Sequence, residues 1–266
     1  MKLSISNLAW SAQQDEIMYA NLEKLGFSGL EIAPTRLFPE QPYAHLKEMQ
    51  AFRQRIAEEF CLCIPSMQSI WYGRQEELFA DAQQRQILLD YTKKAVDFAS
   101  AAECRNLVFG SPKKRCLYQN SDYETGLLFF SELAEYACAH GTVIGIEANP
   151  AIYETNYITT TQQALRLIQE VGSDGLRLNL DIGTMLANQE KADILSGAVK
   201  YIQHVHVSEP FLKTVMPHPL HGEVFRILKQ ENYQGYISVE MGRQPDTETV
   251  LDVMQYVRKA VQNAIS

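Results

Sequence analysis

The chain has 266 residues, of which 46% are hydrophobic and 21% are charged, and its formal net charge is −8. Such an acidic chain is poorly suited to nucleic acid, since non-specific binding depends on Lys and Arg side chains that neutralise phosphates. It shows neither an apolar stretch of membrane-spanning length nor an apolar run in its first residues. We therefore expect a cytoplasmic protein that binds no nucleic acid and no membrane.

Short apolar runs alternate with longer amphipathic runs along the whole chain, which is typical of repeated βα units and a parallel sheet. Strands are predicted, in chain order, at residues 2–7, 29–33, 62–68, 105–110, 142–147, 176–181, 202–207 and 236–240. Helices are predicted at residues 12–25, 44–60, 80–102, 122–140, 159–172, 189–199, 220–232 and 246–264. A (β/α)₈ barrel usually takes about 250 residues. The pattern therefore predicts a single α/β domain, a (β/α)₈ TIM barrel, over residues 1–266.

Four predicted strands end on a residue that can bind a metal: Glu147, Asp181, His206 and Glu240. The carboxyl ends of barrel strands surround one crevice, so these residues converge although 34, 25 and 34 positions separate them. Carboxylates in such a crevice repel one another, and a cation removes that conflict. The oxygen-rich set favours Mn²⁺ or Mg²⁺, with Zn²⁺ or Co²⁺ as alternatives. The competing interpretation is a hydrogen-bonded network of rim carboxylates and a core histidine.

On these residues, in the motifs IGIEANP, LDIGT, HVHVSE and ISVEMG, the chain resembles the xylose-isomerase-like TIM barrel superfamily, which includes sugar phosphate isomerases and ketohexose 3-epimerases. The resemblance covers essentially the whole chain and implies that the four residues bind one divalent ion. It implies a metal-dependent isomerase or epimerase of a small sugar, sugar phosphate or related polyol. We expect Glu147 and Glu240 to flank the substrate and to transfer a proton through an enediolate.

The resemblance also indicates residues that contact the substrate. Glu154 matches an acidic loop residue of the epimerases, and Lys213 lies near the place of an arginine that contacts their substrate. Thr184 stands where many epimerases have a histidine, and a hydroxyl does not carry protons near neutral pH, so the substrate preference relative to them is open. Glu31 and Gln68, at the ends of the second and third strands, occupy positions where relatives bind hydroxyl groups.

Further candidates rest on residue chemistry. The loop FGSPKKR after the fourth strand places Lys113, Lys114 and Arg115 at the active face, where they would bind a phosphate or carboxylate. A solvated charge run explains them equally well. Trp10 follows the first strand and offers an apolar ring to a sugar, although packing also accounts for it. His204 lies two residues before the expected ligand on the same strand face and is interpreted as a core or supporting residue.

Other functions remain open on the same sequence. A cyclitol (inosose-type) dehydratase would use the same proton abstraction, and a sugar-binding barrel would have no catalysis. An endonuclease IV-like phosphodiesterase needs a histidine-rich cluster of three zinc ions and a basic groove, which six histidines and a net charge of −8 disfavour. The oligomeric state is also open, with a homo-oligomer among the alternatives.

Overall fold

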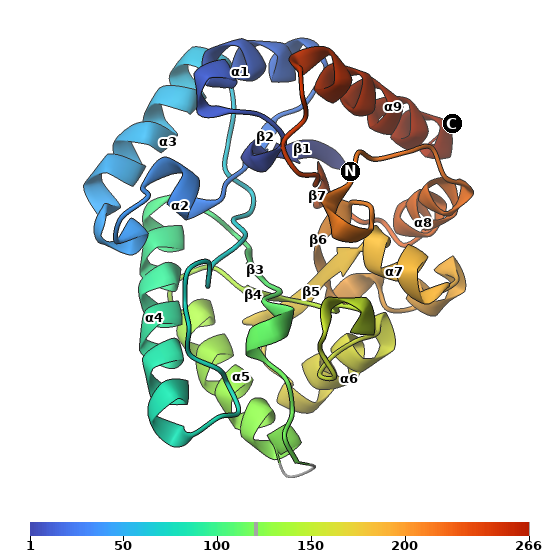
Figure 1. Ribbon diagram of the computed structural model, residues 1–266. Coiled ribbons are helices and arrows are strands. Elements are labelled where there is room, and N and C mark those ends of the chain that lie inside the picture. Colours follow the sequence, from blue (N-terminus) through green and yellow to red (C-terminus); the bar gives the residue numbers. More distant parts are fainter. Residues whose placement is uncertain (120–121, 266) are drawn as a thin grey trace.

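The computed structural model describes residues 1–119 and 122–265 and shows a curled parallel β-sheet with helices around its outside (Figure 1). Within the described residues the sheet has seven strands, in the order β2-β1-β7-β6-β5-β4-β3. The strands are β1 (Lys2–Ser6), β2 (Gly29–Glu31), β3 (Leu107–Phe109), β4 (Ile144–Glu147), β5 (Leu176–Asp181), β6 (Ile202–Val207) and β7 (Tyr236–Val239). Each of them lies within a predicted strand, so seven of the eight predictions are confirmed.

An outer layer of helices covers the sheet. These helices are α1 (Asp15–Lys24), α2 (Pro34–Leu37), α3 (Leu46–Phe60), α4 (Ala82–Ala101), α5 (Asp122–Ala139), α6 (Thr161–Val171), α7 (Ile182–Asn188), α8 (Pro219–Gln230) and α9 (Thr247–Ile265). Their buried residues pack with the apolar residues of the strands in one hydrophobic core. No helix in the described part of the chain has the length and apolarity needed to cross a bilayer.

The remaining predicted strand, the third in chain order at residues 62–68, does not form as a regular strand. Pro65 interrupts it, because proline has no N–H to donate to a neighbouring strand. The segment still lies between β2 and β3: the Cys63 carbonyl accepts a hydrogen bond from β2 (2.9 Å), and the Met67 carbonyl accepts one from β3 (2.8 Å). The fold is therefore TIM-barrel-like, with seven strands and one irregular segment across the remaining gap, and the prediction of eight regular strands is not met.

The helix predicted at residues 189–199 is wrong. Helix α7 begins instead directly after β5, because the Asp181 side chain caps it by accepting two backbone N–H hydrogen bonds. The helix ends before Gln189, whose φ of 56° is left-handed, and 3₁₀ turns follow at Ala192–Leu195 and Val199–Tyr201. The acidic residue that ends the strand thus also starts the helix, and the chain turns tightly at the rim of the sheet.

Side chains along the strands alternate between the helical layer and the interior of the curled sheet. On β6, Val205 and Val207 are fully buried on one face, while His204 and His206 lie on the other face, where both contact Glu31. The same period of two places a small or polar residue before each of the other expected ligands. These residues are Gly145, Asn179 and Ser238. Branched apolar layers usually fill a TIM barrel, so this polar interior favours charged side chains above it.

Candidate metal centre

Three of the four expected ligands lie together at the carboxyl end of the sheet. Nδ1 of His206 is 3.3 Å from Oε2 of Glu147 and 3.1 Å from Oε2 of Glu240. The ligand atoms of these residues all lie within 4.8 Å of one another. His206 is fully buried, and each glutamate is 8% exposed. The carboxylates are therefore largely withdrawn from water but still reach the surface at the barrel mouth.

Neighbouring side chains hold Glu147 as a hydrogen-bond acceptor. Its Oε1 accepts from the side-chain amide of Asn149 (2.8 Å), and its Oε2 accepts from that of Asn179 (3.0 Å). Arg115 donates to the Glu147 backbone carbonyl (2.7 Å) and to Oδ1 of Asn149 (2.6 Å). Both carboxylate oxygens thus face donors, which is the arrangement that an ionised carboxylate requires.

Asp181, the fourth expected ligand, lies beside His206 in the register of β5 and β6. Its Oδ1 accepts hydrogen bonds from Gly183 N–H (3.0 Å) and from the Ser208 hydroxyl. Its Oδ2 accepts from the backbone N–H (3.2 Å) and the hydroxyl (2.9 Å) of Thr184. The structure therefore directs Thr184 toward Asp181. A ligand role for Asp181 stays a prediction, and it would require one of these oxygens to be shared.

The electrostatics of the cluster reflect an excess of negative charge. Burial, with the charges of Glu147 and Asp181, raises the pKa of Glu240 to about 7 although His206 opposes the shift. Burial and the charge of Glu147 raise the pKa of Asp181 to about 6. Burial alone would lower the pKa of His206, but the carboxylates of Glu240 and Glu31 raise it well above its ordinary value. Protons thus supply the positive charge that these side chains need in order to coexist.

This donor set fits a divalent cation. The imidazole Nδ1 and two carboxylate oxygens face one another at 3.1 and 3.3 Å, and all three accept rather than donate when they are unprotonated. Carboxylates with one imidazole suit Mn²⁺ or Mg²⁺, and also Zn²⁺ or Co²⁺. A cation among them would replace the protons that the raised pKa values otherwise retain.

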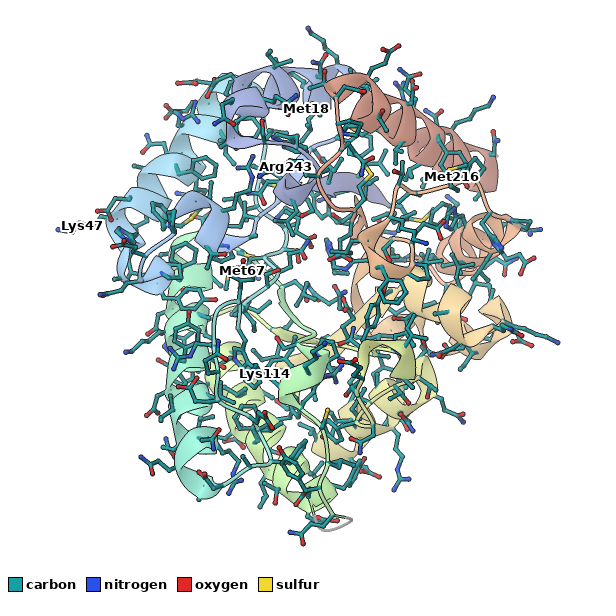
Figure 2. The ribbon with its side chains drawn as sticks, viewed as in Figure 1. Met18, Lys47, Met67, Lys114, Met216 and Arg243 are labelled. Carbon is teal, nitrogen blue, oxygen red and sulfur yellow. The ribbon has the colours of Figure 1, made fainter. Side chains whose placement is uncertain are left out.

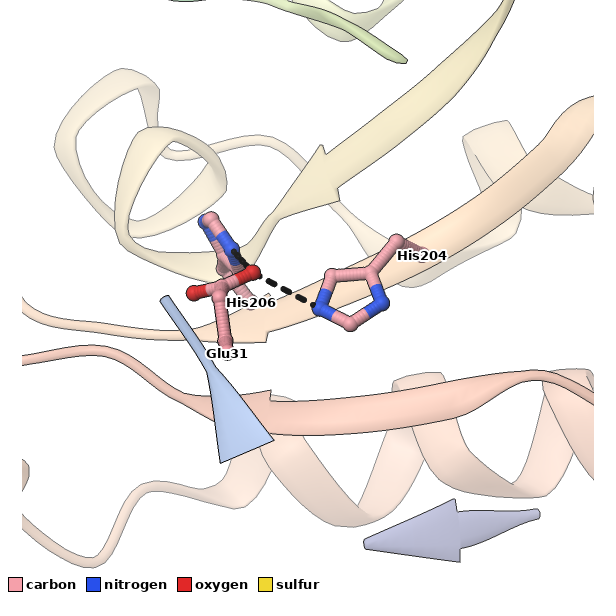
Figure 3. A group of neighbouring side chains, drawn as sticks. All are labelled: Glu31, His204 and His206. Carbon is pink, nitrogen blue, oxygen red and sulfur yellow. Dashed lines mark hydrogen bonds and ion pairs between the residues drawn. The ribbon is translucent and has the colours of Figure 1, made fainter. Parts of the chain in front are cut away.

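Glu31 and Gln68 lie on the far side of the imidazole, away from the carboxylates. Glu31 is fully buried, and its Oε2 lies 2.9 Å from Nε2 of His206 and 3.0 Å from Nε2 of His204 (Figure 3). Its Oε1 accepts a hydrogen bond from Nε2 of Gln68 (3.0 Å), which also donates to Ser6 (2.8 Å). Both side chains are buried in this network, which differs from the rim position expected for contacts with substrate hydroxyls.

The basic loop FGSPKKR does not form an exposed cluster of three cations. Lys113 pairs with Glu154 at 2.5 Å, and these two side chains are 67% and 74% exposed. Lys114, labelled in Figure 2, donates to the carbonyl of Gln75 (3.1 Å). Arg115 is fully buried, burial lowers its pKa to about 10, and its Nε and Nη1 have no hydrogen-bond partner in the described part of the chain. Its direct contacts support Glu147 and Asn149 instead of an anion at the surface.

Trp10 is also withdrawn from the mouth. The ring is 1% exposed, and its Nε1 donates to Asp15 (2.8 Å), so packing accounts for its position. Lys213 is exposed on the loop after β6. Arg243, labelled in Figure 2, is an exposed residue three positions after Glu240.

The other side of the mouth holds a cavity of about 820 Å³ that the sequence did not reveal. Its walls come from the loops after β1, β2 and the 62–68 segment, with Leu212 from the loop after β6. Tyr72 has 72% of its surface exposed there, and the guanidinium carbon of Arg74 lies 4.7 Å from the centre of the Tyr91 ring. Two residues that line the cavity, Gln41 and Ser69, have left-handed backbone conformations (φ of 43° and 57°), which residue spacing does not predict.

A curled parallel sheet with acidic and imidazole side chains at its carboxyl edge defines a TIM-barrel-like α/β protein with a ligand cluster. The sequence matches the profile of the xylose isomerase-like TIM barrel family over residues 19–260. The chain therefore belongs to this family, and the predicted family is confirmed. A search of curated proteins gives no match.

Several sugar epimerases have similar solved structures. The apo form of 3-keto-D-glucoside 4-epimerase from E. coli has a TM-score of 0.79 at 18% identity, with 97% of this chain and 99% of that chain covered. D-psicose 3-epimerase from Clostridium cellulolyticum H10, solved with D-tagatose, has a TM-score of 0.79 at 17% identity, with 100% of both chains covered. L-ribulose 3-epimerase has the same score at 17% identity, with 99% and 96% covered. At these identities the likeness shows the fold.

Proposed function

We propose that this protein is a divalent-metal-dependent isomerase or epimerase of a small sugar or sugar derivative. The cluster of Glu147, His206 and Glu240 at the carboxyl edge of the sheet carries the proposal. Glu240 directly follows β7, which pairs with the strand of the imidazole, β6, and Glu147 ends β4, which β5 separates from β6. The family and the sugar epimerases of similar fold support it.

Glu147, His206 and Glu240 would hold the ion, with Asp181 as a fourth ligand. When bound, a divalent ion polarises a carbonyl group and stabilises the negative charge that develops beside it. Mn²⁺ or Mg²⁺ suits this set of ligands best because most of the ligand atoms are carboxylate oxygens.

We assign proton transfer to Glu147 and Glu240. They approach Nδ1 of His206 from β4 and from the end of β7, so they reach a bound sugar from different directions. Glu147 faces amide donors with both oxygens, and we assign it as the base that takes the proton from the carbon next to the carbonyl. Glu240 would return a proton to the opposite face of that carbon, which gives an epimer, or to the neighbouring carbon, which gives an isomer.

Exchange of a substrate proton with solvent tests the proposal. Metal-depleted protein is incubated in D₂O with a panel of ketohexoses and ketopentoses, with and without added Mn²⁺. We expect deuterium next to the carbonyl only with the metal, and none in Glu147→Gln. Binding without exchange would identify a sugar-binding barrel instead. Loss of water from a cyclitol ketone, measured by mass, would identify a dehydratase.

A further inference from the structure

We propose that Glu31 is a positioning residue, whose hydrogen bond to Nε2 of His206 keeps the Nδ1 lone pair of that ring directed at Glu147 and Glu240. This inference rests on the proposed metal centre and extends it. Among the described residues, two groups of three candidate ligands share His206. The first consists of Glu147, His206 and Glu240, and the second of Glu31, His204 and His206. The inference assigns the ion to the first group only and gives the second group the task of orienting it.

The two ring nitrogens of His206 face different partners. Nε2 lies 2.9 Å from Oε2 of Glu31 (Figure 3), whereas Nδ1 faces Glu147 and Glu240 at 3.3 and 3.1 Å. A neutral imidazole has one N–H and one lone pair. Because the Glu31 carboxylate only accepts, it selects the form with the hydrogen on Nε2. The lone pair is then on Nδ1, where a metal ligand needs it.

Asn179 favours the same form from the opposite edge of the ring. Its amide oxygen accepts from Asn106 (3.3 Å), and its amide nitrogen donates to Oε2 of Glu147 (3.0 Å). These partners fix which end of the amide is which, since a carboxylate cannot donate. The same nitrogen lies 3.2 Å from Nδ1 of His206, a position that suits a lone pair and not an N–H.

Glu31 is itself held in place and closed to solvent. Gln68 donates to its Oε1, and Nε2 of His204 lies 3.0 Å from its Oε2. Glu31, His204 and His206 are 0%, 1% and 0% exposed. A second ion would have to enter this position without its hydration shell and without a solvent-facing ligand site. The surroundings therefore favour a fixed orienting carboxylate over a second metal site.

Glu31→Gln changes this arrangement at nearly constant shape. The amide oxygen takes the place of Oε1, because it still accepts from Gln68, and the amide nitrogen then faces His206. The ring must accept at Nε2, which moves its hydrogen to Nδ1 and into the ligand position. We expect the Co²⁺ and Mn²⁺ affinity of the folded protein to fall about 10- to 100-fold, the range typical for loss of such an outer partner.

The measurement is competition with a chelator, together with metal content per chain and the visible spectrum of bound Co²⁺. The expected result is one ion per chain in the parent and weaker binding with an altered spectrum in Glu31→Gln. The matched control is Glu190→Gln, a carboxylate on the loop after α7 that accepts from Asn188 (3.0 Å) and belongs to neither ligand group, for which affinity stays constant. Unchanged affinity in Glu31→Gln overturns the proposal. Two ions in the parent with one lost in the variant also overturns it, because Glu31 would then be a ligand.

A second variant keeps the test decisive if Glu31→Gln does not fold. Gln68→Leu removes the donor to Oε1 and leaves the Glu31 carboxylate in place but less constrained. A severalfold loss of Co²⁺ affinity supports the proposal, and affinity within twofold of the parent contradicts it. A parent protein that binds no divalent ion would contradict the proposed function instead, so the two failures are distinguishable.

Discussion

The two sides of the barrel mouth are built in different ways. The metal side consists of the ends of β4, β5, β6 and β7, which are continuous strands of four to six residues. The cavity side consists of the loops after β1, β2 and the 62–68 segment, where β2 has three residues and the third segment is irregular. A regular strand fixes the direction of its last side chain, whereas a loop wall adapts more easily. Under the proposed function, the chemistry therefore belongs to the metal side and substrate selection to the cavity side.

The largest expected effect comes from removing a carboxylate on the metal side. Glu147→Gln or Glu240→Gln should lower substrate proton exchange about 10³-fold or more, because each loses an acid–base group and a negatively charged ligand. In the metal-free fold, Glu240→Gln should not lose stability, since glutamine keeps the shape and relieves repulsion between buried carboxylates. Glu147→Gln should lose about 1–3 kcal/mol, because its amide nitrogen then faces an amide N–H donor. Deuterium incorporation and melting temperature measure the two effects. Near-parent exchange in either variant would remove that residue from proton transfer.

Metal removal should produce the next largest effect. An ion that binds only the folded state adds about 4 kcal/mol to the free energy of unfolding at a free concentration of 1,000 Kd. Chelation should therefore abolish exchange and lower the melting temperature by on the order of 10 °C in a chain of this size. Added Mn²⁺ should restore both. Chelation should lower the melting temperature of Tyr72→Ala, on the cavity side, by the same amount. A melting temperature that does not change with added or removed metal would exclude the metal centre.

The sequence predicted the elements whose signals are local. Seven strands and all the long helices follow from hydrophobic periodicity, which depends only on neighbouring residues in the chain. The two failures involve interactions that compete with this pattern. Pro65 breaks the third strand, and the side chain of Asp181 begins α7 earlier than the amphipathic pattern indicated.

The same distinction between local signals and contacts across the fold applies to the candidate site. Glu147, His206 and Glu240 could be brought together from the sequence because strand ends in a parallel sheet meet at one edge. The positions of Glu31 and Arg115 could not be predicted in this way. Their positions depend on contacts with residues of other strands and loops, with which sequence spacing has no fixed relation. Charged residues next to a predicted site therefore support its ligands as readily as they contact a substrate.

His221 offers a way to separate acid effects on the scaffold from acid effects at the metal side. It is 1% exposed on α8, its Nδ1 lies 2.8 Å from the Tyr256 hydroxyl, and burial with the charge of His218 lowers its pKa to about 4. Between pH 6.5 and 4 the unfolded chain gains a proton that the folded chain does not. The free energy of unfolding should therefore decrease as the pH is lowered from 6.5 to 4, by on the order of 3 kcal/mol in total.

Replacement by phenylalanine should flatten this dependence. In His221→Phe the free energy of unfolding should change less between pH 6.5 and 4 than in the parent, as measured by urea unfolding at fixed metal concentration. Activity lost in the parent but retained in His221→Phe over this range reflects the scaffold. An equally steep stability profile in both proteins would show that His221 is not the responsible group.

A smaller effect is expected on the cavity side. Tyr72→Ala should raise KM by about 5- to 10-fold at constant kcat, since a ring that contacts the substrate away from the reacting carbon contributes binding of about 1 kcal/mol. Its stability should stay within about 0.5 kcal/mol because 72% of the side chain is exposed. Tyr118→Ala is the matched control, a tyrosine that is 64% exposed outside the cavity. Equal KM values in all three proteins would remove the cavity from substrate binding.

The smallest effect is expected from Lys113, which the sequence placed in an anion site. Lys113→Ala should change turnover of a neutral sugar and of its phosphate by less than twofold, because this lysine already pairs with Glu154 on the surface. Lys213→Ala is the comparison, an exposed lysine on the loop after β6, next to the metal side. If the substrate is anionic, this second change should raise KM severalfold for the phosphate alone, and added salt should weaken the difference. A selective loss of the phosphate in Lys113→Ala, with Lys213→Ala unchanged, would instead return anion binding to the FGSPKKR loop.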